Sequence, residues 1–551
     1  MRSVVVSLRG LGPERPCDER LVSYDIEMAE VTGGTFWKPF SPGQVSGVEP
    51  YPQPKGPLPA QGEGDGDDAP SELDMSSLLD DTERLMARRG PADLGNARLR
   101  ALARAIGPSW VRVSGSWATG TYYDFDGHTA GVAPKPYRAV LTRAQWRGVL
   151  DFVRAVGGRL LVSFAVVPGL GNEACRRLGG TGAWDPSQVR LLIDAASELG
   201  VSVSAVEFCN EPNISFLGAT GPDGRPYVPE GYAQDQDAFY RMMRREYPDI
   251  LLVGPCGAMD PVTPELAALP LVRAMGDSFV TSGRLLEVCR EVPDVFSYHI
   301  YGGISERGAV FGRHWDADEA ASDAALAVAD RARRYYEPLR DCFCPGAPLW
   351  VTESGDANCG GNTWGSTFLD VFRQADELAR FAAAAPGGVL FHNTLASSDY
   401  GLLDEGDLSP RPNWWLLWLW RKLVGNGAYD SDGLVASDEA AGAGAHIYGF
   451  ARAGHVPGAT LVVINNSQAD ELCLELSASG DCYTLSSAEA PVSGVVPTAR
   501  LRSRDVLLNG RPLRLGPDDE LPRVADYAVR QSRGRVAFRP ATVSFLVLQE
   551  A

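Results

Sequence analysis

The chain has 551 residues, which is more than a single compact domain usually contains. Hydrophobic residues make up 44% and charged residues 22% of the chain, a balance typical of soluble globular proteins with a large core. The 51 Lys and Arg residues against 70 Asp and Glu residues give a net charge of -19. Such a surface repels nucleic-acid phosphates and anionic lipids, so we expect no nucleic-acid partner and no membrane partner.

The ten cysteines and six histidines are scattered, and Cys342 with Cys344 is the only close cysteine pair. No group of them has the spacing of a zinc site, and we expect neither a metal nor a cofactor. Met1–Gly12 lacks the apolar core and cleavage site of a signal peptide, which favours a cytoplasmic protein with reduced thiols. Only four of the 51 basic residues are lysines, which is typical of a GC-rich, bacterial genome.

A predicted strand at Ser23–Glu27 is followed by a segment of unusual composition, residues 41–91. Within it, Pro50–Pro59 is rich in proline and Gly62–Asp68 consists of glycine and acidic residues. Neither stretch can form a packed element, so we expect a long insertion loop. Its role stays open between covering a cleft and mediating self-association.

From Asn96 onward, predicted helices and strands alternate for about 300 residues. The expected helices are Asn96–Ile106, Thr142–Val156 with Thr142 as N-cap, Pro186–Leu199, Asp235–Glu246, Asp323–Tyr336 and Phe368–Ala383. The expected strands are Trp110–Val113, Arg159–Val167, Val203–Phe208, Ile250–Gly254, Val295–His299, Pro348–Thr352 and Gly388–His392. Such alternation indicates an α/β fold with a parallel sheet, and the number of units favours a closed (β/α)8 TIM barrel over residues 21–425.

The pattern changes after the barrel, and residues 426–551 are expected to form an all-β sandwich. Short alternating strands such as His446–Ala451, Ala459–Ile464 and Ala541–Leu548 are separated by Gly, Asn and Asp turns. Residues 1–20 contain a further strand, Val4–Leu8, which we expect to join this sandwich.

Two glutamates follow or end different strands of the predicted barrel. Glu211 comes just after Val203–Phe208, and Glu353 comes directly after Pro348–Thr352. Active residues of such barrels lie at the carboxyl ends of the strands, so these two carboxylates should face one cleft. Glycoside hydrolysis needs such a pair, because one carboxyl protonates the leaving oxygen while the other attacks or stabilises the sugar. Either glutamate alone could equally be a solvated loop residue.

The tripeptides Asn210-Glu211-Pro212 and Thr352-Glu353-Ser354 resemble those of a retaining glycosidase clan with (β/α)8 barrels. Within that clan, the chain resembles glycoside hydrolase family 79, which contains heparanases and β-glucuronidases. The resemblance covers nearly the whole chain. The segments that carry it are Pro108–Gly115, Val206–Leu217, Val295–Gly302, Asp399–Glu405, Asn413–Leu416 and Asp505–Leu513.

The resemblance implies a role for several residues. Glu211 would be the general acid/base and Glu353 the nucleophile. Asn210 would bind the sugar 2-hydroxyl, and His299 and Tyr301 would orient the nucleophile; each of the latter two could instead be a core residue. Glu27 matches a sugar-contacting acid of the family, or is an ordinary charge at a strand end.

The family resemblance also implies a site for the C6 carboxylate of a uronic acid. Members bind it with backbone N–H groups of a Gly-rich loop and with a tyrosine hydroxyl, which here are Cys359, Gly360 and Gly361, and Tyr400. Asn358 and Cys359 replace a Tyr and a Gly of the usual pattern, and a plain structural turn is the alternative. His392 could contact the substrate or fill the barrel mouth.

We therefore expect an exo-β-glucuronidase acting on a glucuronide or a uronic-acid-containing oligosaccharide. Three alternatives stay open. An endo-acting enzyme on glycosaminoglycans would need a basic cleft, which the sequence does not provide. A neutral-sugar β-glycosidase would keep the two glutamates, and a carbohydrate-binding protein would have lost catalysis.

Overall fold

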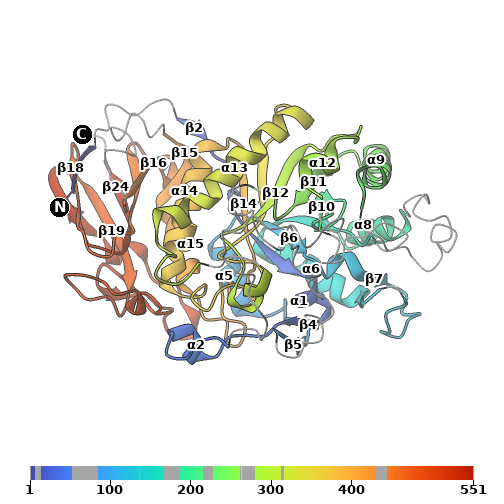
Figure 1. Ribbon diagram of the computed structural model, residues 1–551, viewed down its shortest axis with the longest axis horizontal. Coiled ribbons are helices and arrows are strands. Elements are labelled where there is room, and N and C mark those ends of the chain that lie inside the picture. Colours follow the sequence, from blue (N-terminus) through green and yellow to red (C-terminus); the bar gives the residue numbers. More distant parts are fainter. Residues whose placement is uncertain are drawn as a thin grey trace, which may run out of the picture.

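The computed structural model describes residues 2–6, 14–52, 85–135, 137–166, 186–214, 227–260, 262, 280–311, 315–429 and 444–549. Most of the predicted insertion, residues 53–84, lies outside the described residues. The last two residues of the predicted strand Val4–Leu8 and the last residue of the predicted strand Arg159–Val167 also lie outside them. Figure 1 shows a barrel beside a region of twisted β-sheets.

Eight parallel strands close into a barrel, and the fold predicted from the sequence is confirmed. In chain order the strands are β3 (Val22–Glu27), β6 (Trp110–Ser114), β9 (Arg159–Ser163), β10 (Val203–Glu207), β11 (Leu251–Gly257), β12 (Val295–Tyr301), β13 (Leu349–Gly355) and β14 (Val389–His392). Apolar side chains from these strands, including Trp110, Leu161, Trp350 and Phe391, form one buried cluster. The barrel therefore has a packed core, and its chemistry is confined to the ends of the strands.

Helices cover the outside of the barrel (Figure 1). They are α5 (Ala97–Ala105), α6 (Arg143–Val156), α8 (Ser187–Glu198), α9 (Pro229–Glu246), α12 (Ser282–Leu286), α13 (Asp323–Phe343) and α14 (Val371–Ala384). Thr142 caps α6 in a capping box with Gln145, as expected. The predicted end of α13 at Tyr336 is wrong: the helix continues past Pro338, which removes only one backbone donor.

Shorter elements extend the loops at the ends of the barrel strands. They are α1 (Met28–Thr32), β4 (Gly34–Trp37), α2 (Pro42–Ser46), β5 (Met86–Arg89), β7 (Thr121–Asp124) and β8 (Ala139–Thr142). The described ends of the predicted insertion therefore contain α2 and β5. β5 pairs with β4, and Ser41 caps α2 in a capping box.

The all-β region contains two sheets. One has the strand order β1 (Arg2–Val6), β18 (Leu472–Leu476) and β23 (Gly534–Phe538). The other contains β2 (Arg15–Pro16), β15 (Val424–Ala428), β16 (His446–Arg452), β17 (Ala459–Asn465), β24 (Thr542–Leu548), β19 (Gly480–Ser487), β20 (Val506–Leu508), β21 (Arg511–Pro512) and β22 (Val529–Gln531). β1 pairs in parallel with β18, so the amino-terminal strand lies in this region.

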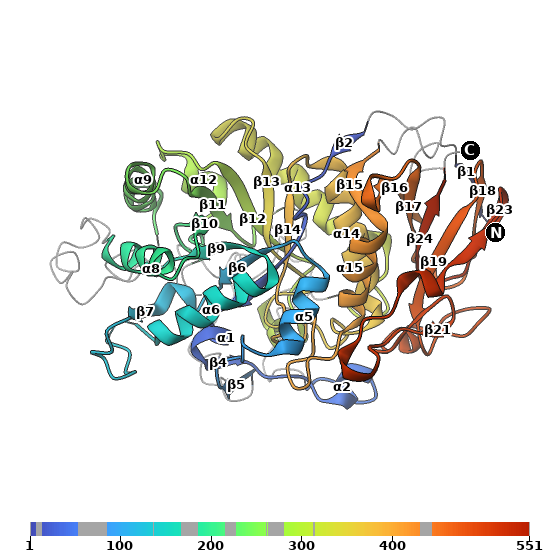
Figure 2. The same ribbon diagram turned by 180° about the vertical axis from the view of Figure 1, so that it is seen from behind.

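A tryptophan-rich helix lies between the barrel and the sheets. α15 (Pro412–Leu423) and α14 occupy this position in both views (Figures 1 and 2). Trp420 of α15 packs against Phe450 and Phe545 of the larger sheet. The two regions thus share one hydrophobic core.

Short 3-10 helices complete the described structure. They are Ala118–Gly120, Glu306–Phe311, Phe368–Asp370, Ala453–His455, Thr498–Arg500, Pro517–Asp519 and Val524–Tyr527. None of the described helices combines the length and the apolar character needed to cross a bilayer.

Candidate active site

Glu211 and Glu353 meet at the carboxyl end of the barrel. Glu353 lies within β13, and Glu211 lies four residues beyond the end of β10. Both are buried, and one oxygen of each carboxyl lies within 4.8 Å of the other and of a ring nitrogen of His299. Glu211 has a φ of 44°, a conformation that costs free energy for a residue with a side chain and recurs at functional sites.

Arg112 organises the base of this cluster from β6. Its Nη1 donates to Glu353 Oε1 (2.8 Å), its Nη2 donates to Asn210 Oδ1 (2.7 Å), and its Nε donates to Glu207 (3.0 Å). Asp25 of β3 lies 3.6 Å away. A fully buried guanidinium needs several such partners, and here they fix the nucleophile candidate in place.

His299 and Tyr301, both on β12, connect to the two carboxyls. His299 Nδ1 lies 3.0 Å from Glu211 Oε1 and 3.5 Å from Glu353 Oε2. The Tyr301 hydroxyl donates to Glu353 Oε2 (2.7 Å) and accepts a hydrogen bond from the Asn393 amide (2.7 Å). Burial raises the pKa of Tyr301 well above its ordinary value, so its hydroxyl stays a donor to Glu353.

The two carboxyls have pKa values shifted in opposite directions. Burial, followed by the charge of Glu353, raises the pKa of Glu211, although His299 and Arg112 oppose this. Burial also acts on Glu353, but the charges of His299 and Arg112 and the hydrogen bond from Tyr301 together lower its pKa. A protonated Glu211 beside an ionised Glu353 is the arrangement that an acid and a nucleophile require.

Asn210 and Glu27 lie next to this pair. Asn210 Oδ1 accepts from Arg112 and from Ser114 Oγ (3.3 Å), which leaves its amide nitrogen as a donor for a ligand. Glu27 Oε2 is buried without a hydrogen-bond partner, and burial raises the pKa of Glu27 well above its ordinary value. Gly115 makes room for this carboxyl, because a Cβ there would overlap it.

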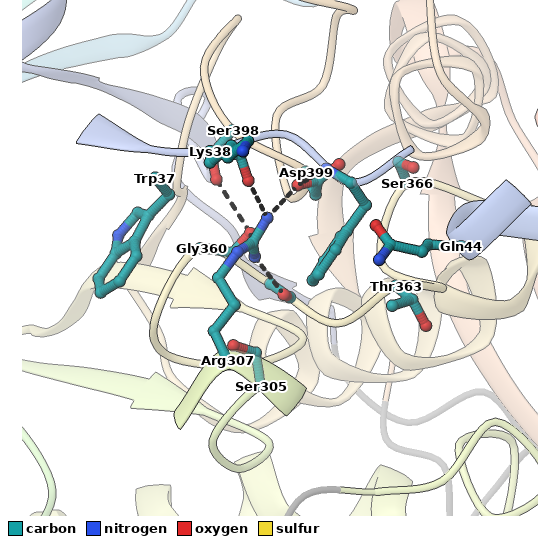
Figure 3. Close-up of polar contacts among 12 residues, drawn as sticks. Trp37, Lys38, Gln44, Ser305, Arg307, Gly360, Thr363, Ser366, Ser398 and Asp399 are labelled. Atoms are coloured by element: carbon teal, nitrogen blue, oxygen red, sulfur yellow. Dashed lines mark hydrogen bonds and ion pairs between the residues drawn. The ribbon is translucent and has the colours of Figure 1, made fainter. Parts of the chain in front are cut away.

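The loop after β13 is held by its carbonyl groups. Arg307 Nη1 donates to the carbonyls of Cys359 (3.3 Å), Gly360 (3.1 Å) and Gly361 (2.9 Å), which all have positive φ values. Figure 3 shows Arg307 beside Gly360. Tyr400 lies beside this loop, and a Cβ on Gly361 would lie 3.2 Å from its backbone nitrogen. The Tyr400 ring lies near the carboxylate cluster, with its centroid 6.3 Å from that of the Tyr301 ring. Burial, with the charges of Glu27 and Glu353, raises the pKa of Tyr400 well above its ordinary value.

Three proteins of known name are similar to most of the chain. Heparanase-like protein 1 of Arabidopsis thaliana is 23% identical over 500 residues, covering 83% of this chain and 84% of the relative. Hyaluronoglucuronidase of Hirudo nipponia is 22% identical, covering 83% and 90%. Baicalin-β-D-glucuronidase of Scutellaria baicalensis is 25% identical, covering 70% and 68%. The resemblance to glycoside hydrolase family 79 is confirmed.

The solved structures agree with this resemblance at the level of the fold. A 4-O-α-L-rhamnosyl-β-D-glucuronidase from Fusarium oxysporum 12S is 12% identical and aligns over 99% of this chain and 100% of its own, with a TM-score of 0.54. No family model matches the sequence. The similarity to glycoside hydrolases of family 79 supports the prediction that this chain is a glycosidase.

Some of the residues implied by the family 79 resemblance belong to one hydrogen-bonded cluster, and others lie beside it. Glu211, Glu353, Asn210, His299 and Tyr301 form one hydrogen-bonded cluster around Arg112. Glu27, Tyr400 and the loop Cys359–Gly361 lie beside it. Their roles toward a substrate stay predictions.

His392 is engaged by the protein on both sides of its ring. Its Nε2 lies 2.6 Å from the Tyr400 carbonyl, and its Nδ1 lies 3.0 Å from Gln374 Nε2. Burial and the charge of Arg373 lower the pKa of His392 to about 3, so the ring is neutral. In this arrangement His392 supports the backbone of Tyr400.

Two groups of described side chains have ligand atoms close enough for a metal ion. The first is Glu211, His299 and Glu353, in which hydrogen bonds from Arg112 and between His299 and Glu211 already engage the carboxyls. The second is Asp124, Asp126 and His128, near the surface.

In the second group, Asp124 accepts backbone hydrogen bonds from Gly127, His128 and Thr129. These bonds are those of a tight turn, and they occupy the oxygens that a metal would need.

Arg112, Arg307 and Asn393 were not among the predicted site residues. A sequence signal exists for Arg112, which is a charged residue within an otherwise apolar strand. Such a residue is rarely buried unless it is paired. For Arg307 and Asn393 the chain offers no comparable signal, because their partners come from distant loops.

Proposed function

We propose that the chain is a retaining exo-β-glucuronidase that releases terminal β-linked glucuronic acid. The observation that carries this proposal is the buried cluster of Glu211, His299 and Glu353. In it, an oxygen of the Glu211 carboxyl lies within 4.8 Å of an oxygen of the Glu353 carboxyl. Carboxyl groups of retaining glycosidases lie about 5–5.5 Å apart, whereas inverting enzymes leave about 6.5–9.5 Å for a water molecule.

The mechanism follows from the two protonation states. Ionised Glu353 attacks the anomeric carbon while protonated Glu211 gives its proton to the leaving oxygen, and the glycosidic bond breaks. A glycosyl ester on Glu353 is the result. Water then attacks the anomeric carbon as Glu211 takes one of its protons, which releases the sugar and restores both carboxyls.

The choice of a uronic acid rests on the loop after β13 and on the relatives. The amides of Gly360 and Gly361 point away from Arg307, which holds the carbonyls of the same two peptide units, and they would bind the C6 carboxylate together with the Tyr400 hydroxyl. Two of the similar proteins carry glucuronidase names. A neutral hydroxymethyl group would use these donors less well.

Exo action is favoured by charge. The net charge is -19, and the described loop Trp315–Ala320 after β12 contains Asp316, Asp318 and Glu319. Acidic side chains near a cleft repel a long sulfated polyanion but act weakly on one terminal uronic acid.

The test is hydrolysis of three p-nitrophenyl glycosides: β-glucuronide, β-glucoside and β-xyloside. We expect at least a hundredfold higher kcat/KM for the glucuronide, which is about 2.7 kcal/mol of transition-state discrimination. The Glu353→Gln variant serves as the inactive control. Preference for a neutral sugar would overturn the substrate assignment and keep the two-glutamate mechanism.

Exo action is tested on a hyaluronan oligosaccharide with a terminal glucuronic acid. Release of the monosaccharide alone is expected. Internal cleavage to shorter oligosaccharides would instead favour the endo alternative. Binding of the oligosaccharide without turnover of any substrate would favour a carbohydrate-binding protein.

A further inference from the structure

Arg307 is a fully buried arginine that does not touch the catalytic pair. It follows β12 and points into a space enclosed by three other loops (Figure 3). Besides the three carbonyls of the loop after β13, its Nη2 donates to the Lys38 carbonyl (2.6 Å) and to Asp399 Oδ2 (2.6 Å). Its guanidinium also lies over the Phe40 ring, 3.6 Å from the centroid.

The carbonyl contacts fix the direction of the loop amides. In each peptide unit the C=O of one residue and the N–H of the next point in opposite directions. Arg307 captures the carbonyls of Cys359 and Gly360, so the N–H groups of Gly360 and Gly361 point away from it. The third amide in this run, that of Asn362, donates to Asp356 Oδ2 (2.6 Å).

A side chain at Gly360 or Gly361 would disturb this arrangement. A Cβ on Gly360 would lie 2.6 Å from Trp37 Cγ and 3.0 Å from Arg307 Nη1. Positive φ values at both positions also favour glycine. The two amides are thus free of side chains that would shield them from a ligand.

Arg307 also reaches Tyr400 through Asp399. The ion pair between Arg307 and Asp399 fixes the residue directly before Tyr400, and the Phe40 amide donates to the same oxygen of Asp399 (3.2 Å). Both parts of the carboxylate site in the proposed function, the loop amides and the tyrosine, are therefore connected to one guanidinium.

We propose that Arg307 is a positioning residue for uronic-acid selectivity, which aims the amides of Gly360 and Gly361 and the Tyr400 hydroxyl at the substrate carboxylate. This inference rests on the proposed function. The positive charge behind the carbonyls polarises the peptide groups and strengthens their N–H ends as donors. Asp399 offsets the charge, so the buried arginine is tolerated without direct contact with the sugar.

The test uses Arg307→Lys, because lysine keeps the charge but cannot contact three carbonyls and a carboxylate in one plane. The kcat/KM values for p-nitrophenyl β-glucuronide and β-glucoside are measured for the wild type and the variant. We expect the glucuronide value to fall at least thirtyfold and the glucoside value less than threefold. The preference for the glucuronide should therefore fall at least tenfold.

Arg380→Lys is the matched control. Arg380 pairs with Asp376 (3.0 Å) and lies over the Tyr448 ring, at the contact between the barrel and the sheets. This variant removes a similar contact far from the carboxylate site, so its preference for the glucuronide should stay within twofold of wild type.

An equal loss on both substrates, or no loss, would overturn the role of Arg307. If Arg307→Lys does not fold, as judged by circular dichroism, Asp399→Asn decides with the same two substrates. It should lower the preference at least fivefold, and an unchanged preference would overturn the inference. A wild-type enzyme without preference for the glucuronide overturns the proposed function first, and the inference with it.

Discussion

Arg112 on β6 donates a hydrogen bond to Glu353 on β13 (2.8 Å), although β14 and β3 separate these strands in the barrel. One guanidinium thereby reaches the nucleophile candidate across the mouth of the barrel. Burial raises the pKa of Glu353, but the charges of His299 and Arg112 and the hydrogen bonds from Tyr301 and Arg112 together lower it below its ordinary value. The protonation state of Glu353 thus depends on a residue that need not touch the sugar.

Arg112→Lys should therefore damage catalysis more than binding. Lysine keeps a charge but cannot donate to Glu353, Asn210 and Glu207 at once. We expect kcat to fall about a hundredfold while KM changes little, with the acidic limb of the pH–rate profile moved to higher pH because the pKa of Glu353 rises. Rate profiles from pH 3 to 8 provide the measurement. An unmoved acidic limb would contradict this role of Arg112.

The two glutamates should respond differently to removal of their charge. Glu353→Gln should abolish turnover on every substrate while the fold stays intact. Glu211→Gln should lower kcat/KM more than a thousandfold on a methyl β-glucuronide. On the p-nitrophenyl glycoside, whose leaving group needs no proton, it should lower kcat/KM less than a hundredfold. Equal loss on both substrates would contradict the assignment of Glu211 as the acid.

The activity of the wild type should have a bell-shaped pH profile, in which Glu353 determines the acidic limb and Glu211 the alkaline limb. Activity should fall as the pH drops through the lowered pKa of Glu353, because the nucleophile becomes protonated. It should also fall as the pH rises through the raised pKa of Glu211, because the acid loses its proton. In Glu211→Gln the alkaline limb should disappear on p-nitrophenyl β-glucuronide, and its persistence would assign that limb to another group.

Gly115→Ala should impair the enzyme through Glu27. The added Cβ would overlap the Glu27 carboxyl, and Gly115 has a φ of 89°, which is strained for alanine. We expect at least a tenfold lower kcat/KM, since Glu27 must move within the site. Gly157→Ala is the control: Gly157 has a similar φ of 66° but open space around its Cβ position, so only stability should fall, by about 1 kcal/mol.

Glu30→Gln should make folding stability less sensitive to pH. Burial raises the pKa of Glu30 from 4.5 to about 8, and its Oε2 accepts from the Glu27 amide. The Glu30 carboxyl ionises near pH 4.5 in the unfolded chain but only near pH 8 in the folded chain. As the pH rises across that interval, this carboxyl therefore progressively lowers the free energy of unfolding. The variant should therefore unfold at a higher temperature than wild type at pH 8.5 and at nearly the same temperature at pH 4. Equal differences at both pH values would exclude this linkage.

The barrel and the catalytic pair could be predicted because their signals are local. Strands buried on both faces are rich in apolar residues, and Leu160–Ser163 and Val203–Glu207 contain only two serines and Glu207 as polar residues. Glu211 and Glu353 stand out because they follow or end such strands. The structure starts α9 at Pro229, ahead of the predicted Asp235, so the prediction missed the signals of Pro229 at the first position and Glu230 in the first turn. Gly231 in the same turn disfavours a helix and weakens these signals.

The rest of the site depends on contacts between distant loops. Arg307 and Asp399 lie 92 residues apart, and nothing in either segment indicates that they pair. A histidine at a strand end, such as His392, has several possible partners. Only the packing of α14 shows that Gln374 is one of them. The sequence pattern predicts that a residue lies at the end of a strand. It does not predict which residues of distant segments bind its side chain.

The parallel pairing of β1 with β18 joins Arg2 to Leu472. A ribosome makes β1 long before β18, so this strand has to wait through synthesis of the entire barrel with its edge unpaired. An unpaired strand can also pair with other chains. The amino-terminal strand therefore docks late in folding, and a newly made chain is exposed to aggregation until the smaller sheet is complete.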